Sequence, residues 1–397
     1  MTSTKRLVPE LRFPEFNGEW EKRKLKDIAK FQNGKAHEKL VSISGDFVLV
    51  NSKFISTNTQ VKKFVSQQLT PLNKEDIAIV MSDIPNGKAL AKCFLVNENN
   101  KYTLNQRVGR IYDISGDSRF LYAILNRNTQ LLKYDNGVGQ TNLKKSEITH
   151  IVLKCPKNAE QKKIGDFFSK LDRQIELEEK KLELLEQQKK GYMQKIFSQE
   201  LRFKDENGNA FPKWVTQKIK ELGNVYTGNT PSKKQSTYWN SNNYIWVTPT
   251  DINNKKDLKN SEYMLSNEGF KKARQLPKNT LLITCIASIG KNAILREEGS
   301  CNQQINALVP NSDKNVDFLY YAFEKVSKYM KRIAGKTATQ IVNKSTFENI
   351  SIEVPNFEEQ LKAGRFLNSF DKLIEKQVSK IELLKQRKQG FLQKMFV

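Results

Sequence analysis

The residues able to carry out catalytic or metal chemistry are few in this chain, and they are not grouped. The only histidines are His37 and His150, and neither has a recognisable triad partner. The four cysteines, which show no CxxC spacing, are Cys93, Cys155, Cys285 and Cys301. Because a zinc site needs ligands clustered at short spacing, we expect no metal site. We interpret the cysteines as reduced thiols of a cytoplasmic protein.

Two short stretches come near to known catalytic or nucleotide-binding motifs, and both fail. Asp83-Ile84-Pro85-Asn86 has one proline where the catalytic tetrapeptide of an adenine methyltransferase has two, and it lacks the aromatic residue. Gly290-Lys291 is followed by Asn292 and lacks the first glycine of the phosphate-binding pattern GxxxxGK[ST]. The sequence therefore predicts a chain that is not an enzyme and holds no cofactor of its own.

Side chains suited to reading DNA bases are abundant in the polar stretches. Asn and Gln can pair with adenine, and Arg or Lys with guanine. In the first half of the chain the candidates are Asn33, Lys35, Asn51, Ser52, Lys53, Arg107, Asn136, Gln140 and Asn142. In the second half they are Asn229, Thr230, Thr248, Thr250, Asp251, Ser288, Lys291, Gln304, Lys336, Thr339 and Gln340. For each position the alternative interpretation is a turn residue or a solvated polar side chain.

The positive charge is concentrated on the parts that carry these candidates. The formal net charge is +24, and residues 1–155 hold 25 Lys and Arg against 15 Asp and Glu, while residues 199–354 hold 23 against 15. Two basic surfaces suit a polyanion contacted twice, although charge for solubility is the alternative. No apolar run approaches the roughly 20 residues that span a bilayer, and the N-terminus lacks the apolar stretch of a secretory signal. We expect a cytoplasmic protein without a membrane segment.

The sequence contains an internal duplication. Residues 156–198 align without a gap on residues 355–397, with 19 of 43 positions identical. The remaining parts repeat more loosely. Leu11-Arg12-Phe13 matches Leu201-Arg202-Phe203, Asn105-Gln106 matches Asn302-Gln303, and Phe120-Leu121-Tyr122 matches Phe318-Leu319-Tyr320.

Both closely matched segments are predicted to be long helices, because apolar residues recur at alternating spacings of four and three. The apolar members of this seam are Ile164, Phe168, Leu171, Ile175, Leu182, Leu185, Tyr192 and Ile196 in the first copy, and Ala363, Leu367, Phe370, Ile374, Ile381, Leu384, Phe391 and Met395 in the second. Polar residues interrupt both seams at the same places. A narrow seam must be buried on another helix, so we expect the two copies to form a coiled coil.

The sequence also predicts how the two long helices begin and offers two explanations for one glycine inside each of them. Asn158 followed by Gln161, and Asn356 followed by Glu359, are typical of a capped helix start. Gly191 and Gly390 occupy equivalent places inside the helices, where close helix approach or a kink would explain them.

The globular segments are predicted to be mixed α/β domains. Short apolar runs bounded by turn residues recur in both, DFVLV matching YIWVT and DIAIVM matching TLLITCI, and they predict strands. FLYAILNRNTQLLKY and FLYYAFEKVSKYMKR have helical spacing. We expect an α+β chain with a pseudo-two-fold repeat: a domain at 1–155, a helix at 156–199, a domain at 200–354 and a helix at 355–397.

In this duplicated order the whole chain resembles the specificity subunit of type I restriction-modification systems. The residues that carry the resemblance are the Glu160-Gln161 and Glu359-Gln360 pairs after a proline, the helix ends GYMQKIF and GFLQKMF, the VTPTDI and SIGK segments, and the NQ pairs. The resemblance implies two target-recognition domains, each reading one half of a split DNA site. It also implies that the two helices pack antiparallel and fix the unread spacer between the halves.

The resemblance further implies partners that carry the chemistry. The helices would dock two modification (methyltransferase) subunits, to which up to two restriction subunits can add, and S-adenosylmethionine, ATP and Mg would act in those partners. Two other functions stay open at this point. One is a self-sufficient methyltransferase or nuclease with unrecognised motifs, and the other is a coiled-coil scaffold whose basic domains bind acidic proteins.

Overall fold

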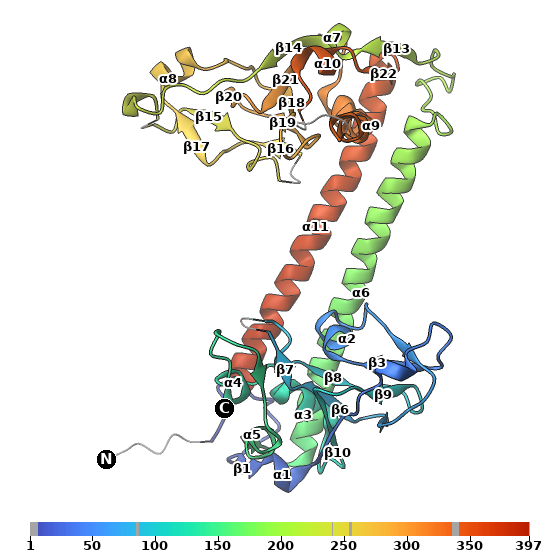
Figure 1. Ribbon diagram of the computed structural model, residues 1–397, viewed down its shortest axis with the longest axis vertical. Coiled ribbons are helices and arrows are strands. Elements are labelled where there is room, and N and C mark those ends of the chain that lie inside the picture. Colours follow the sequence, from blue (N-terminus) through green and yellow to red (C-terminus); the bar gives the residue numbers. More distant parts are fainter. Residues whose placement is uncertain (1–6, 85–86, 240, 254–255, 336–340, 397) are drawn as a thin grey trace. The chain divides into compact units, whose positions relative to one another are not determined.

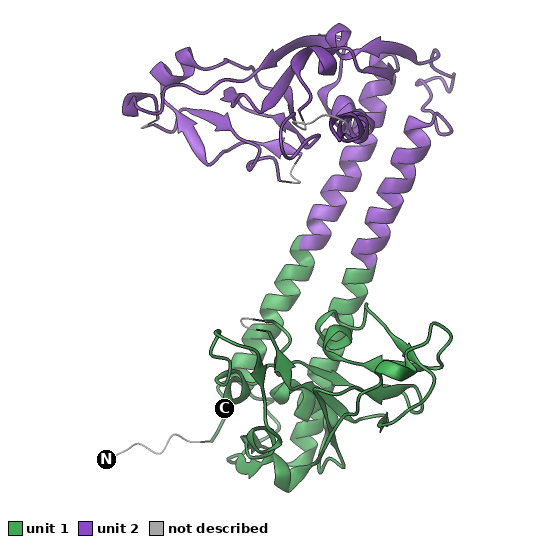
Figure 2. Cartoon of the chain, viewed as in Figure 1, with its two compact units in different colours: residues 1–180, 379–397 green, residues 181–378 purple. Residues whose placement is uncertain are grey.

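A computed structural model describes residues 7–84, 87–239, 241–253, 256–335 and 341–396 of the chain. The chain forms two compact units: unit 1 comprises residues 1–180 and 379–397, and unit 2 comprises residues 181–378 (Figure 2). Each unit combines a globular domain with one stretch of each of two long helices. Within the described ranges, no helix has the length and apolar character needed to span a membrane.

The domain of unit 1 is built on two four-stranded sheets (Figure 1). The first has the antiparallel order β2 (Lys30–Asn33), β10 (Val108–Tyr112), β6 (Ile77–Val80), β8 (Cys93–Leu95). The second has the order β4 (Phe64–Val65), β3 (Phe47–Val50), β9 (Tyr102–Leu104), β5 (Pro71–Leu72), in which β3 and β9 are parallel. Two further pairs are β1 (Glu21–Lys24) with β12 (Val152–Cys155), and β7 (Ser82–Asp83) with β11 (Thr141–Asn142). Its short helices are α1 (Leu25–Ile28), α2 (Ser52–Ser56), α3 (Ser118–Leu125), α4 (Thr129–Leu132) and α5 (Lys145–Thr149).

The domain of unit 2 repeats this plan with one strand more in its larger sheet. That sheet has the order β14 (Gly223–Thr227), β21 (Ile305–Pro310), β18 (Thr280–Thr284), β19 (Asn292–Leu295), β16 (Asp257–Leu258). A three-stranded sheet has the order β17 (Tyr263–Leu265), β15 (Tyr244–Val247), β20 (Gly299–Cys301), and β13 (Val215–Lys218) pairs with β22 (Ser351–Val354). The helices of this domain are α7 (Ile219–Leu222), α8 (Asn267–Lys272), α9 (Val316–Ala334) and α10 (Lys344–Glu348).

The central strands of both domains are apolar on both faces because each separates two cores. In β6, Ile77 and Ile79 belong to one hydrophobic cluster while Ala78 and Val80 belong to another. In β18, Leu281 and Ile283 face one cluster and Leu282 the other. A strand covered on both faces reads as a continuous apolar run instead of an alternating one. The strand predictions from DIAIVM and TLLITCI are therefore confirmed, and with them the mixed α/β character of both domains.

Two local predictions about helices are wrong. The segment FLYAILNRNTQLLKY is two helices, α3 and α4, because Arg127 has a φ of 62° and the side chain of Asn128 caps a new helix at the Gln130 N–H. The first long helix starts at Asn158, so Lys157 and not Asn158 takes the cap position. The corresponding cap prediction for the second long helix is confirmed, because Asn356 Oδ1 accepts the Glu359 N–H at 3.1 Å.

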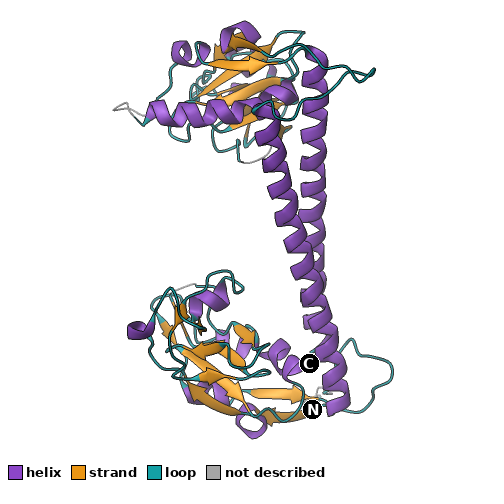
Figure 3. Ribbon diagram, turned by 90° about the vertical axis from the view of Figure 1, so that its right-hand side faces the viewer, coloured by secondary structure: helices purple, strands orange, loops and turns teal. Residues whose placement is uncertain are grey.

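The two long helices, α6 (Asn158–Phe197) and α11 (Phe357–Met395), run side by side within each unit (Figure 3). In unit 1, Lys388 pairs with Asp172, and Lys380 with Glu178 at 2.5 Å. In unit 2, Lys189 pairs with Asp371. Because residue numbers rise along one helix as they fall along the other, the helices are antiparallel. The lysines that interrupt the apolar seam, Lys189 and Lys388, thus bind equivalent aspartates on the opposite helix.

The seam residues lie at this helix contact or at the contact with the domains. Ile164, Ile175, Ile381 and Leu384 are buried. Leu171, Leu182, Leu185, Phe370, Ile374 and Phe391 are half-buried. Tyr192 is 37% exposed, yet its ring packs edge-on against Phe366 at 5.1 Å. The expectation of close helix approach at Gly191 and Gly390 is wrong, because a Cβ added at either glycine would meet no atom within 4 Å.

Candidate nucleic-acid interface

The ends of several strands converge at one edge of the unit 1 domain. Backbone hydrogen bonds join the segments that follow β2, β3, β6 and β9: Gly34 N–H donates to Val108, Asn105 N–H to Val50, and Met81 N–H to Arg107. We call residues 33–35, 51–53, 81–84, 87–90, 105–107 and 136–142 the first recognition edge. The fold thus brings together segments that lie as many as 100 residues apart in the sequence.

Two loops of this edge are held together by a pair of very short strands. β7 and β11 pair Ser82 with Asn142 and Asp83 with Thr141. Gln140 Nε2 donates to Ser82 Oγ at 2.6 Å. The carboxylate of Asp83 accepts the N–H groups of Ala89 at 2.6 Å and Leu90 at 3.1 Å. The stretch Asp83-Ile84-Pro85-Asn86 therefore begins with an aspartate that organises the loop, and its last two residues lie outside the described ranges.

Most of the candidate residues of the first half are exposed on this edge. Exposed candidates are Asn33, Lys35, Lys53, Arg107, Asn136, Gln140 and Asn142, and Ser52 is half-buried. Asn51 has a structural task, because its Oδ1 accepts the Phe54 N–H at 2.8 Å and caps α2. The chain therefore offers amide, guanidinium and ammonium groups to solvent at this edge, while Asn51 shapes the loop behind them.

Unit 2 has an edge built in the same way. Gly228 N–H donates to Ile305, Asn229 N–H to Cys301, and Asn302 N–H to Val247. Val342 N–H donates to Cys285, as Leu143 N–H donates to Met81 in unit 1. We call residues 228–230, 248–251, 285–291, 302–304 and 341–342 the second recognition edge.

The candidates on the second recognition edge divide into exposed groups and groups engaged with the protein itself. Asn229 uses its Nδ2 on Lys272 O at 2.9 Å and its Oδ1 on the Arg274 N–H at 2.6 Å. Asp251 accepts from Thr248 at 2.7 Å and from the Glu262 N–H at 2.9 Å. Thr250 and Lys291 are exposed, and the candidates Thr230, Thr248, Ser288 and Gln304 are half-buried. Lys336, Thr339 and Gln340 lie outside the described residues.

Sequence reasoning missed several residues that the fold places on these edges. Ser82, Ile84 and Lys88 lie on the first edge, where Ile84 and Lys88 are exposed. Val138, which is also exposed, lies within the predicted loop from Asn136 to Asn142. Lys272 and Arg274 lie beside Asn229 at the second edge. No local pattern marks them, because the pairing of β7 with β11 joins loops that are more than 50 residues apart.

The repeated Glu-Gln pairs lie at the junction between domain and helix, one pair in each unit. Arg12 makes a two-point ion pair with Glu160, with Nε at 2.8 Å and Nη2 at 2.7 Å. Arg202 does the same with Glu359 at 2.9 and 2.6 Å. Each Arg belongs to the repeated Leu-Arg-Phe segment, so this motif and the Glu-Gln motif form one structural device in each unit.

The glutamine of each pair fastens the start of a domain helix to the long helix. Gln360 Oε1 accepts the Asn315 N–H at 2.8 Å, at the start of α9, and its Nε2 donates to Pro355 O at 2.9 Å. Gln161 makes the matching bonds with the Asp117 N–H at 3.2 Å and Pro156 O at 2.9 Å. The motif that carries much of the family resemblance thus attaches each domain to its helix.

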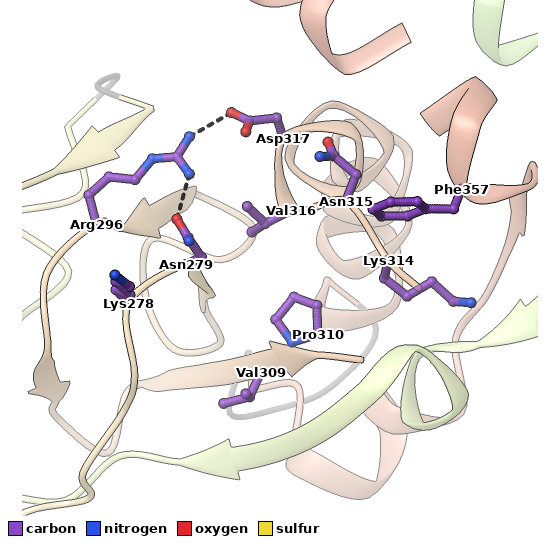
Figure 4. Close-up of a pocket in the computed structure, with 10 residues that line it drawn as sticks. All are labelled: Lys278, Asn279, Arg296, Val309, Pro310, Lys314, Asn315, Val316, Asp317 and Phe357. Atoms are coloured by element: carbon purple, nitrogen blue, oxygen red, sulfur yellow. Dashed lines mark hydrogen bonds and ion pairs between the residues drawn. The ribbon is translucent and has the colours of Figure 1, made fainter. Parts of the chain in front are cut away.

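In unit 2 a half-buried ionic cluster reinforces this attachment. Asp317 on α9 accepts from Lys256 at 2.9 Å and from Arg296 at 2.6 Å, and Lys256 also reaches Asn368 Oδ1 on α11 at 2.6 Å. Arg296 donates further to Asn279 beside a cavity of about 280 Å³ (Figure 4). Burial raises the pKa of Asp317, but the hydrogen bond and charge of Lys256 and the charge of Arg296 outweigh it and leave that pKa below its ordinary value.

The cysteines lie in the protein interior, whereas the exposed side chains on the edges are mainly polar or cationic. All four cysteines are buried, and burial raises the pKa of Cys155 to about 11 and that of Cys285 to about 12, so both are protonated thiols at neutral pH. Across the ranges that the structure describes, no three His, Cys, Asp or Glu side chains are placed to hold a metal ion. What the edges present is hydrogen-bonding and positively charged side chains.

Comparison with known proteins agrees with this arrangement. Residues 17–187 and 212–385 each match the family model described as the type I restriction modification DNA specificity domain. The chain is 34% identical over 203 residues to the MjaIX specificity subunit of Methanocaldococcus jannaschii, an alignment covering 48% of this chain and 45% of that subunit. It is 23% identical over 414 residues to the MjaVIII specificity subunit of the same organism, covering 95% and 92%. The chain spans less than half the length of the first of these relatives and almost the whole length of the second.

Solved structures share the fold. The S subunit of the type I restriction-modification system from M. genitalium superposes with a TM-score of 0.65 at 16% identity, covering 98% of this chain and 99% of that one. A chain from a structure titled for complex assembly and conformational transition of the type I R-M system has a TM-score of 0.55 at 16% identity, with 95% and 97% covered. The two segments that match the family model together cover most of the sequence, so the chain belongs to the type I restriction modification DNA specificity family.

Proposed function

We propose that this chain is the non-catalytic DNA-recognition subunit of a type I restriction-modification complex, and that each recognition edge reads one half of a bipartite site in double-stranded DNA. The observation that carries the proposal is the duplication of the edge. The same strand ends, joined by equivalent backbone hydrogen bonds, present polar and cationic side chains in both units. Two equivalent surfaces with different residues suit two half-sites of different sequence.

The charge of the two domains supports a polyanionic ligand. Residues 1–155 carry a net charge of +10 and residues 199–354 a net charge of +8. The aspartates Asp83 and Asp251 on the edges are turned towards backbone N–H groups, so their charges are partly neutralised by the protein itself. Exposed lysines would contact phosphates and position the domain without specifying a sequence.

Within each edge we assign different tasks to the side chains. Exposed groups such as Lys35, Lys53 and Arg107 are proposed to contact DNA directly. Asn51, Asn229 and Asp251 are proposed to hold the loops in shape, because their polar atoms already bind the backbone. Replacing a loop-holding residue is then expected to weaken binding to all sequences, whereas replacing an exposed one changes discrimination at one base pair.

The paired helices are proposed to set the unread spacer and to dock two modification subunits, to which up to two restriction subunits add. An exposed leucine at matched positions supports the docking role: Leu184 is 58% exposed and Leu383 is 49% exposed. Apolar side chains left on the outer face of a helix pair are suited to burial in a partner. S-adenosylmethionine, ATP and Mg would act in those partners, in the cytoplasm where the DNA is.

The proposal is tested by footprinting the chain on its target, once methylation mapping has identified a bipartite adenine-methylated motif that depends on it. Two protected patches separated by an unprotected gap are expected. Uniform weak binding that moderate salt abolishes would favour the scaffold instead. Cleavage or methyl transfer by the purified chain with Mg and S-adenosylmethionine would favour a self-sufficient enzyme.

Exchange of one domain tests the modular assignment. Replacing residues 1–155 with the corresponding domain of another specificity subunit is expected to change one half of the methylated motif and leave the other half and the spacer unchanged. Replacing residues 200–354 is the matched control and should change the opposite half. A change of both halves in either exchange contradicts the assignment of one half-site to each domain.

A further inference from the structure

Two aliphatic side chains project into solvent from the first recognition edge. Val138 is 85% exposed and Ile84 is 68% exposed. They lie on the two loops that β7 and β11 join, since Ile84 directly follows β7 and Val138 lies three residues before β11. The Gln140 to Ser82 hydrogen bond of 2.6 Å ties the same loops together. Two exposed aliphatic groups therefore belong to one small part of the edge.

In both loops an aspartate side chain accepts a hydrogen bond from a backbone N–H group at or next to the aliphatic residue. Asp83 accepts the Ile84 N–H at 2.9 Å, in addition to the N–H groups of Ala89 and Leu90. Asp135 accepts the Gly137 N–H at 3.1 Å and the Thr141 hydroxyl at 3.3 Å. The Val138 N–H binds Asn136 Oδ1 at 3.1 Å. In each loop the acidic group points inward to the backbone and the apolar group points outward.

The surroundings of the two side chains match the chemistry of a DNA groove. Lys88 and Arg107 are exposed on the same edge, where they can meet phosphates or guanine. In the major groove every base-edge group is a hydrogen-bond donor or acceptor except one: the 5-methyl group of thymine, which proteins read by apolar contact. An exposed aliphatic pair beside cationic groups is suited to that methyl.

We infer that Ile84 and Val138 read thymine methyl groups in the half-site bound by the domain of unit 1. The inference rests on the proposed DNA-recognition function and adds a chemical class of target to it. The half-site must then contain at least one thymine whose methyl group contributes to affinity. Lys88 and Arg107 would hold the backbone or neighbouring bases while the aliphatic pair excludes water from the methyl.

Replacing thymine by deoxyuridine tests this inference, because it removes one methyl group and leaves all hydrogen-bonding groups in place. Duplexes carrying the motif, with each thymine of that half-site replaced singly, are titrated with the full chain. At one or two positions we expect the affinity to fall by roughly three- to tenfold, the size set by burying one methyl group. In Val138→Ala or Ile84→Ala the same replacement should change affinity less than about twofold.

Ile43→Ala is the matched control. Ile43 is fully exposed in the same domain but precedes β3, whereas the recognition edge lies at the other end of that strand. The variant should keep the full deoxyuridine effect. A half-site without thymine, no effect at any thymine, or an equal effect in wild type and Val138→Ala overturns the inference while leaving the proposed function intact. Absence of sequence-specific binding to the unmodified motif overturns the proposed function itself.

Discussion

At the scale of single residues, the junctions between domains and helices depend on a small set of buried polar contacts. Glu359 is fully buried and accepts from both Arg202 and the indole N–H of Trp214, the latter at 3.2 Å. A buried carboxylate is stabilised only while its partners remain, so such a group is far more sensitive to change than a surface ion pair. Substitution of Glu359 or of its partner Arg202 is therefore expected to destabilise the junction more than substitution of a surface ion pair.

Glu359→Gln is expected to destabilise the chain by about 2 kcal/mol, because it leaves the Arg202 guanidinium beside a neutral amide and the Trp214 N–H without its anionic acceptor. Thermal or urea unfolding measures the loss. The adjacent Glu358 is exposed, and Glu358→Gln as control should change stability by less than about 0.5 kcal/mol. Equal effects of the two substitutions would contradict the role given to Glu359.

Asp317 gives the chain a defined dependence on acid. Its pKa is below the ordinary value of about 3.9, so its ion pairs stabilise the folded state above that pH, and this stabilisation is lost as pH falls through the lower folded-state value. Asp317→Asn should cost about 2 kcal/mol at pH 6, since Lys256 stays buried without its anion. In urea unfolding at pH 6, 5, 4 and 3, the difference between wild type and variant should shrink only below about pH 4. A difference independent of pH would contradict this account.

At the scale of elements, glycines on the long helices have opposite surroundings. A Cβ at Gly364 would lie 2.8 Å from Asn315 Oδ1, and one at Gly165 would overlap the carboxylate of Asp117. These two glycines allow α9 and α3 to start directly against the long helices. Gly191 and Gly390 have open space around them. The same residue type therefore serves close packing near the helix starts and has no packing role near the helix ends.

Alanine substitution should separate the two classes. Gly191→Ala and Gly390→Ala are expected to stabilise by roughly 0.5–1 kcal/mol each, because alanine has the higher helix propensity and meets no atom. Gly165→Ala and Gly364→Ala should destabilise by more than about 1 kcal/mol, because the start of a domain helix must move away. Melting temperatures of the four variants measure this. Destabilisation by Gly191→Ala would point to a distortion of the helix at that place.

The lysine and aspartate pairs across the helices should be exchangeable in unit 1. Lys388→Asp should cost about 1 kcal/mol, and adding Asp172→Lys should recover most of it, because only the direction of the ion pair is reversed. The equivalent exchange of Lys189 and Asp371 in unit 2 should recover less. There the hydroxyl of Tyr321 also donates to Asp371, and a lysine cannot accept that bond. Equal recovery in both units would contradict the role of Tyr321.

At the scale of the whole molecule, the proposed spacer function predicts how helix length and DNA spacing are linked. Inserting seven residues into α6 after Lys180 and seven into α11 after Val378 preserves the apolar seam of both helices. At a rise of 1.5 Å per residue this adds about 10 Å, roughly three base pairs of B-form DNA. Methylation mapping should show the same half-sites with a longer gap. The single insertion in α6 alone should disrupt the seam, and an unchanged gap in the matched variant contradicts the spacer role.

The helices, the strands and their duplication can be predicted from the amino-acid sequence alone. Strands such as β6 and β18 and the helices α6 and α11 were predictable, because apolar periodicity is a local property that each segment carries. The matching of Lys189 with Lys388 also indicated equivalent places on two equivalent helices. Two of the wrong predictions are local: Lys157 takes the cap position predicted for Asn158, and the segment predicted as one helix is divided at Arg127. The third, close helix approach at Gly191 and Gly390, concerned tertiary packing.

Which polar residues contact one another and which remain exposed depends on how distant segments pack in the tertiary structure. Gln140 and Ser82 are 58 residues apart in the chain, and Arg202 and Glu359 are 157 residues apart. No local spacing in the sequence predicts either contact. Asn229 looks like a base-reading residue in the sequence, yet the fold directs its amide to the backbone at Lys272 and Arg274. The physical reason is that the role of a polar side chain depends on which groups it hydrogen-bonds to. Those groups come within reach only when distant segments of the chain pack together.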